Sequence, residues 1–130
     1  PGETEKDFED TLSMIERVGF VTGYFFKYSP RNGTPAANMP DQIPEEVKSE
    51  RLSRLLALQN ELTRKHNESL IGKTLFVLAE READKHPGEL IGRSECGRTV
   101  HFKALPDKIG RITPVTVTRV TGNTLAADAE

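Results

Sequence analysis

Apolar residues near the start of the chain recur every three or four positions, the spacing of one face of an α-helix: Phe8, Leu12, Ile15 and Val18. Thr4 stands before them as a good N-cap, and Asp7 three residues later completes a weak capping box. Gly19 follows the last apolar position, where helices commonly end on a left-handed residue. The pattern predicts an amphipathic helix over 5–18.

The next stretch, 20–28, is rich in residues that favour β-structure and predicts a strand. A helix followed by a strand, with a glycine turn before the helix, is typical of one unit of a βα repeat. Such a unit needs another strand before Pro1. We therefore expect the chain to be cut from a larger α/β protein.

A loop and a long helix come next. Prolines and a glycine interrupt 29–44, which argues against regular structure there, and Pro44 suits the first turn of a helix. The predicted helix covers 45–68, and its apolar side is formed by Val47, Leu52, Leu55, Leu56, Leu58 and Leu62. We expect this leucine stripe to pack on neighbouring protein; a leucine zipper or a membrane-surface helix fits it less well.

From Gly72 onward the pattern changes to short β-segments separated by turn residues: 74–78, 89–94, 99–103, 109–120 and 124–127. Five such segments are typical of a small closed barrel, with Gly72, Gly92 and Gly110 as candidate bends. Period-two alternation favours a core position for Phe102. It places His101 and Lys103 together on the opposite, outward face.

Charge is uneven along a chain whose formal net charge is only −2. Between Leu90 and Arg119 the only acidic residues are Glu95 and Asp107, whereas the basic residues there are Arg93, Arg98, Lys103, Lys108, Arg111 and Arg119. A local basic stripe suggests a surface that faces a polyanion, and small barrels bind unpaired RNA with cations and flat side chains. A solvated strand face explains the stripe equally well at this stage.

The remaining composition excludes several classes of protein. No apolar run approaches the ~18 residues of a membrane-spanning helix, and no secretory signal is present. The single cysteine, Cys96, cannot form an internal disulfide or supply the ligands of an iron–sulfur cluster or structural zinc, and we expect a cytoplasmic location. His66, His86 and His101 lack metal-ligand spacing, and no nucleophile or phosphate-loop motif occurs. We predict no catalytic residue and no metal site in this chain.

Longer motifs carry a family resemblance. Residues 1–8 read PGETEKDF, 28–37 read YSPRNGTPAA and 39–48 read MPDQIPEEVK, with RL at 51–52 and LQ at 58–59. In the barrel region, GK at 72–73, LIGR at 90–93, VHF at 100–102 and TGNTL at 121–125 follow in order. These resemble the radical-SAM methylthiotransferases, in the tRNA-modifying (MiaB-type) branch, which end in a TRAM domain. The Ala126-Ala127-Asp128 end departs from the basic or glycine residue common in the family.

The resemblance implies an α+β chain with three parts. A remnant of the α/β radical-SAM barrel, one helix and one strand, would occupy 1–40, the linker helix 41–69, and a five-stranded OB-like antiparallel β-barrel, the TRAM domain, 70–130. It implies the tRNA-binding portion of an enzyme that converts N6-isopentenyladenosine next to the anticodon to its 2-methylthio form. That enzyme uses two 4Fe-4S clusters and S-adenosylmethionine, and we expect no cofactor and no catalysis in this fragment alone.

The resemblance also names candidate residues and partners. Gly2 and Glu3 look like the tail of a motif near the S-adenosylmethionine site, incomplete here. The predicted RNA contacts are Lys73, Arg93, Arg98, His101, Lys103, Arg111 and Arg119. The expected partners are a tRNA anticodon stem-loop and the missing N-terminal domains of the same enzyme, with no membrane.

Three alternatives stay open. A sister branch of the family modifies an aspartate of a ribosomal protein, so the barrel could recognise protein. A stand-alone enzyme is opposed by the single cysteine. Finally, Phe20, Phe25, Phe26 and the leucine stripe of 45–68 would lie exposed without the rest of the barrel, and we expect the N-terminal part to mispack against the long helix or to be buried in a dimer.

Overall fold

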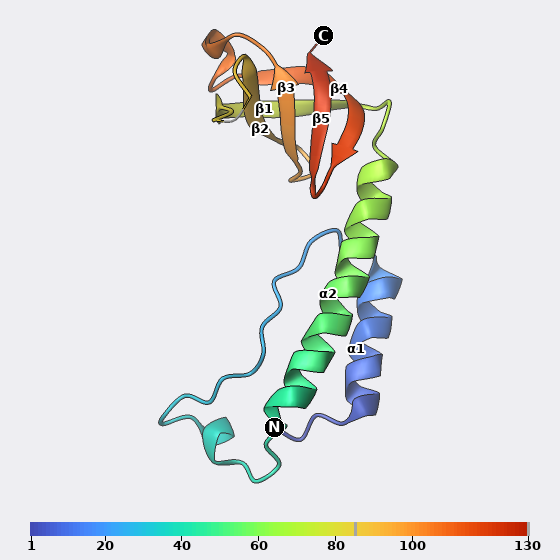
Figure 1. The fold of residues 1–130 in the computed structure, drawn as a ribbon, viewed down its shortest axis with the longest axis vertical. Coiled ribbons are helices and arrows are strands. Elements are labelled where there is room, and N and C mark those ends of the chain that lie inside the picture. Colours follow the sequence, from blue (N-terminus) through green and yellow to red (C-terminus); the bar gives the residue numbers. More distant parts are fainter. Residues whose placement is uncertain (85, 130) are drawn as a thin grey trace. The chain divides into compact units, whose positions relative to one another are not determined.

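The structure, a computed structural model, describes residues 1–84 and 86–129. The chain divides into two compact units, Pro1–Thr63 and Arg64–Glu130. The first unit contains helix α1 and most of helix α2, and the second contains five strands, β1 to β5 (Figure 1). Neither helix in the described part of the chain is long and apolar enough to cross a membrane.

Helix α1 covers Glu5–Val18, as the spacing predicts. The capping box is formed: the Asp7 backbone N–H donates to the Thr4 hydroxyl (3.2 Å), and the Thr4 N–H donates to the Asp7 carboxylate (2.8 Å). At the other end, the Gly19 N–H donates to the Ile15 carbonyl (3.0 Å) with a φ of 71°. Both ends of α1 are therefore set by local signals in the sequence.

Helix α2 covers Glu45–Glu68, which confirms the predicted bounds. Within the first unit, α1 and α2 share a small core of Phe8, Ile15 and Leu55. Partly buried apolar residues surround this core: Leu12, Phe25, Leu58 and Leu62. Three members of the leucine stripe, Leu55, Leu58 and Leu62, thus pack within the first unit together with Phe25, so the expectation that these residues lie exposed is wrong, whereas Leu56 is 42% exposed.

The predicted strand over 20–28 is wrong. These residues run extended but belong to no sheet, because a strand needs a neighbouring backbone and the described residues supply none here. Side chains of α2 hold the segment instead: Gln59 donates to the Phe20 carbonyl (2.7 Å) and Thr63 to the Val21 carbonyl (2.7 Å). Tyr24 and Phe26 are 92% and 85% exposed. A short 3₁₀-helix, Pro35–Asn38, interrupts the following loop.

The second unit is the predicted five-stranded barrel. Its strands are β1 (Thr74–Glu82), β2 (Glu89–Ser94), β3 (Thr99–Lys103), β4 (Ile112–Thr121) and β5 (Thr124–Ala129), with a 3₁₀-turn at Pro106–Lys108. The barrel closes in the order β1-β2-β3-β5-β4. Four of these strand pairs are antiparallel, whereas β3 and β5 are parallel. This pair is parallel because β5 turns back from β4 and inserts beside β3.

Inward residues of all five strands form one apolar core. Phe102 is 1% exposed, which confirms the prediction from alternation. The members of the core are Leu70, Leu75, Val77, Ala79, Leu90, Val100, Phe102, Val115, Val117, Leu125 and Ala127. Position 92 on β2 has no room for a side chain, because a Cβ at Gly92 would lie 2.3 Å from the Leu78 carbonyl oxygen.

Candidate nucleic-acid interface

An outward row of residues crosses the strands β3, β5 and β4. His101 on β3 is paired with Ala126 on β5, and Ala126 is paired on its other side with Arg119 on β4. The β4 register shifts between Val117 and Arg119, so Thr118 is an extra residue there. The Thr118 hydroxyl donates to the Ala126 carbonyl (3.1 Å). This bulge is what places Arg119, rather than Thr118, opposite Ala126.

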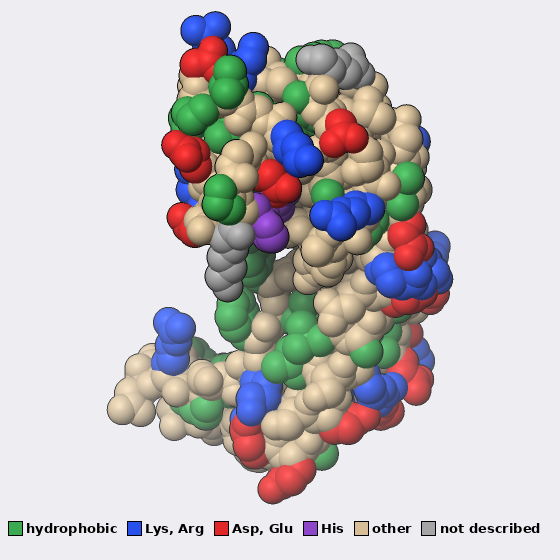
Figure 2. Space-filling view, turned by 45° about the horizontal axis from the view of Figure 1, so that its top comes forward, with side chains coloured by type: hydrophobic (Ala, Val, Ile, Leu, Met, Phe, Trp, Pro, Cys, Tyr) green, Lys and Arg blue, Asp and Glu red, His purple; other side chains and the backbone are tan. Residues whose placement is uncertain are grey.

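The row borders a hollow of about 190 Å³ in the barrel surface, which we call the β3–β5 hollow. It is lined by His86, Glu89, His101, Arg119, Thr121, Thr124, Leu125 and Ala126. Ala126, the smallest of these side chains, stands between His101 and Arg119 in the row. Figure 2 shows histidine side chains set back among acidic and basic groups of the surface.

The connection between β1 and β2 contributes one wall of the hollow. The His86 N–H donates to the Ala83 carbonyl (3.2 Å), and the Glu89 N–H donates to the His86 carbonyl (3.0 Å). The two imidazole rings of His86 and His101 meet edge to face, with centroids 6.2 Å apart and an interplanar angle of 89°. Both imidazole rings therefore belong to residues that line the hollow.

The polar groups of the hollow are mixed in charge. Arg119 supplies hydrogen-bond donors and the Glu89 carboxylate supplies acceptors, while each imidazole can do either. The Thr124 hydroxyl donates to the Thr121 carbonyl (2.9 Å), so its oxygen remains free to accept. The arrangement suits a small, flat group that carries both donors and acceptors.

Of the predicted RNA contacts, only His101 and Arg119 share the hollow. Lys103 is exposed on the outer face of β3, paired in register with Glu89 on β2 and Asp128 on β5. The other exposed cations lie elsewhere on the barrel: Lys73 before β1, Arg93 on β2 and Arg111 before β4. The guanidinium of Arg93 lies 3.7 Å from the Glu80 carboxylate.

Arg98 faces the protein rather than the exposed basic surface. It is 4% exposed, and its guanidinium donates to the Asn123 carbonyl (2.8 Å), which ties the β2–β3 turn to the β4–β5 turn. Burial lowers the pKa of Arg98. Burial, followed by the charges of Arg98 and Lys73, also lowers the pKa of His66. A contact between Arg98 and RNA stays a prediction.

Sequence reasoning missed His86, Glu89, Thr121 and Thr124 as members of a site. His86, Thr121 and Thr124 lie in or beside predicted turns, and none forms a motif with His101. The pairing of β3 with β5 is what brings them together. The available signal was weak: a histidine and a glutamate around the Pro87-Gly88 turn, next to the strand that pairs with 99–103.

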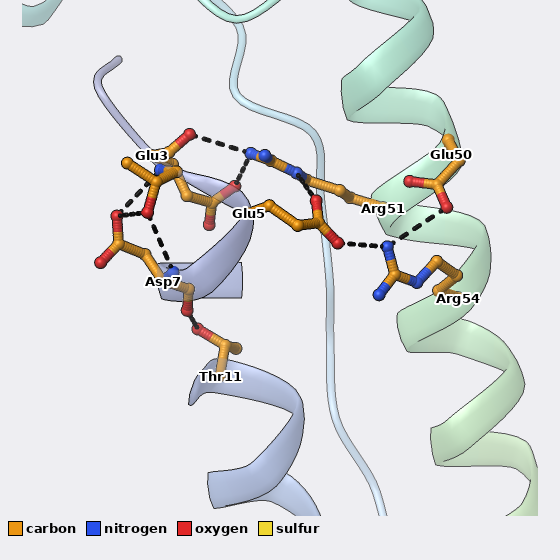
Figure 3. Close-up of polar contacts among 8 residues, drawn as sticks. Glu3, Glu5, Asp7, Thr11, Glu50, Arg51 and Arg54 are labelled. Carbon is orange, nitrogen blue, oxygen red and sulfur yellow. Dashed lines mark hydrogen bonds and ion pairs between the residues drawn. The ribbon is translucent and has the colours of Figure 1, made fainter. Parts of the chain in front are cut away.

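Gly2 and Glu3 take part in contacts within the first unit. The Gly2 N–H donates to the Asp41 carbonyl (2.8 Å), and the Glu3 carboxylate binds the Arg51 guanidinium (2.8 Å). Figure 3 shows Arg51 reaching from α2 to Glu3 and Glu5, with Arg54 between Glu5 and Glu50. A hydrogen bond from Arg54 is the main cause that lowers the pKa of Glu5.

The cofactors implied by the resemblance do not fit the residues present. Residues 1–84 and 86–129 contain no group of three or more His, Cys, Asp or Glu side chains that could hold a metal ion. An iron–sulfur cluster needs several thiolates, and Cys96 is the single cysteine of the chain. The Glu3 carboxylate is already bound to Arg51. We assign no catalytic step to these residues.

Comparison with known proteins places the barrel in a family. Residues 68–129 match the TRAM domain. The chain is 46% identical over 118 residues to the tRNA-2-methylthio-N(6)-dimethylallyladenosine synthase of Pelotomaculum thermopropionicum, covering 91% of the chain and 26% of the relative. It is 45% identical over 128 residues to the protein of that name from Alkalilimnicola ehrlichii, covering 98% of the chain and 29% of the relative. The protein of the same name from Agrobacterium fabrum is 46% identical to the chain over 128 residues, covering 98% of the chain and 28% of the relative. The chain thus spans about a quarter of the length of these curated relatives.

Proposed function

Because the chain carries a TRAM domain and is, over nearly its whole length, a relative of the tRNA methylthiotransferases, we propose that it is the tRNA-binding portion of such an enzyme. In this proposal the barrel binds the anticodon stem-loop. The transfer of a methylthio group to N6-isopentenyladenosine, with its iron–sulfur clusters and S-adenosylmethionine, belongs to domains outside the 130 residues. A cytoplasmic location goes with a tRNA substrate.

The observation that carries the proposal is the outward row His101–Ala126–Arg119, with its adjoining hollow, on a TRAM barrel. Small barrels bind unpaired RNA by combining cations, which follow the phosphates, with flat side chains that contact bases. Arg119 and Lys103 supply exposed cations on this face, and His101 supplies a flat ring. The relatives described above are all named for a tRNA product, which favours RNA over a ribosomal protein.

Salt dependence tests the proposal. The 130-residue chain is titrated against an anticodon stem-loop at a series of salt concentrations, with fluorescence anisotropy as the readout. We expect log K to fall linearly with log salt. Lys103→Gln should lower affinity and reduce the slope by about 0.7 to 0.9, the contribution of about one phosphate contact.

The matched control is Arg17→Gln, which removes the same charge from the exposed surface of α1. It should leave both affinity and slope unchanged. Absent binding, or binding that does not respond to salt, would contradict the proposal. An equal effect of the two variants would show that only net charge matters.

A further inference from the structure

We propose that the β3–β5 hollow receives a single unpaired nucleobase of the bound RNA. This inference rests on the proposed function and adds to it which part of the RNA is held and by which residues. It does not follow from the basic stripe, because most of the exposed cations lie outside the hollow.

The size of the hollow limits its occupant. Its volume of about 190 Å³ is below the ~300 Å³ at which pockets for drug-sized molecules begin. An unstacked nucleobase is a flat group smaller than a drug-sized molecule, so its size suits a hollow of this volume. The recess exists because position 126 is alanine: a longer side chain between His101 and Arg119 would fill it.

The rings around the hollow suit a flat occupant. His86 and His101 both line the hollow and lie edge to face, with ring centroids 6.2 Å apart. Unpaired bases in RNA complexes stack on aromatic side chains, histidine included. The backbone of the wall that carries His86 is held by hydrogen bonds to Ala83 and from Glu89, which limits the cost of ordering this loop on binding.

Charge separates a base from a phosphate. A phosphate carries only acceptors and a negative charge, and the Glu89 carboxylate lining the hollow would repel it. A nucleobase presents both donors and acceptors on its edges, which match the Glu89 carboxylate and the Arg119 guanidinium respectively. The mixed polarity therefore selects the base, and leaves the phosphates to Lys103 and the other exposed cations.

The experiment compares RNAs that differ by one base. The 130-residue chain is titrated with an anticodon stem-loop and with a set in which each loop nucleotide in turn is abasic. We expect one abasic position to weaken binding roughly tenfold, the scale of one stacked base. Ala126→Leu should weaken binding of the intact loop by a similar factor, and should bind the intact and abasic loops equally.

Two controls keep the result interpretable. Thr99→Leu places the same leucine side chain on the outer face of β3, outside the hollow, and should bind as the unmodified chain does. The salt slope of Ala126→Leu should stay unchanged, because the phosphate contacts remain. If Ala126→Leu does not fold, His86→Ala removes one ring from a loop rather than from a strand, and should give the same loss.

The outcomes separate the two proposals. If the chain binds the stem-loop with a steep salt slope but Ala126→Leu binds like the unmodified chain, the base pocket is wrong and tRNA binding stands. If none of the abasic stem-loops binds more weakly than the intact one, the base pocket is likewise wrong and tRNA binding stands. A chain that binds no RNA would overturn the proposed function, and the base pocket with it.

Discussion

Gly92→Ala tests whether the close approach of β1 and β2 is a requirement of the barrel. A Cβ at Gly92 would lie 2.3 Å from the Leu78 carbonyl oxygen and 2.5 Å from Val77 Cγ1, whereas ordinary contacts begin near 3.4 Å. The first of these atoms is backbone, so the β1–β2 pairing itself must move by about 1 Å. The φ of Gly92 is outside the left-handed region, so the effect is purely steric.

We expect Gly92→Ala to lower the free energy of unfolding of the barrel by about 2 kcal/mol, in the range found when a packed core is overfilled. Gly97→Ala is the matched control. Its φ is 76° and its Cβ would meet no atom within 4 Å, so it should cost only about 1 kcal/mol, from the left-handed backbone alone. The difference between the two variants isolates the steric contact.

The assay must report on the barrel alone. The chain has no tryptophan, and both tyrosines, Tyr24 and Tyr28, lie in the first unit, so intrinsic fluorescence would follow the wrong part. Urea unfolding followed by the NMR amide signals of β2 and β3 avoids this. A cost of Gly92→Ala below about 0.5 kcal/mol, or no larger than that of Gly97→Ala, would refute the reasoning.

Two further predictions concern the first unit. Thr4→Ala removes the N-cap of α1 and should lower the stability of the helix by about 1 kcal/mol in thermal unfolding. The control is Thr11→Ala, inside the same helix, which should change the stability much less. Equal losses in the two variants would contradict the capping role of Thr4. Hydrogen bonds from Lys27 and then Lys48 lower the pKa of Glu45 from 4.5 to about 2, so this carboxylate contributes stability above pH 4.5 that is lost as the pH falls towards 2. Glu45→Gln should flatten that part of the curve of stability against pH, and an unchanged curve would contradict the assignment.

The features predicted correctly depend on signals within a few residues. Helix α1 begins at the Thr4–Asp7 box and ends at Gly19, and each signal acts through a hydrogen bond inside its own turn. The burial of Phe102 followed from alternation because a strand places every second side chain on the same face. These conclusions need no knowledge of which segment lies next to which.

The segment 20–28 shows where such reasoning fails. Its residues favour β-structure, but that preference describes how side chains fit a pleated surface with neighbours, and the described residues offer no neighbouring strand. The burial of Arg98 could not be read from the sequence either: it belongs to the basic stripe in sequence, yet its guanidinium donates to the Asn123 carbonyl between the β2–β3 and β4–β5 turns and it is 4% exposed. Sequence proximity to other cations did not predict exposure.

The sequence alone therefore determined the two helices, the five strands of the barrel and the inward face of Phe102, because local backbone preferences and the alternation of side chains along a strand depend only on nearby residues. The tertiary structure decided the β3–β5 hollow. A parallel pairing across 20 or more residues of chain sets His101 beside Ala126, and a single extra residue at Thr118 turns Arg119 towards the same place. Pairing register is a property of two strands at once, and no local pattern in either strand specifies it.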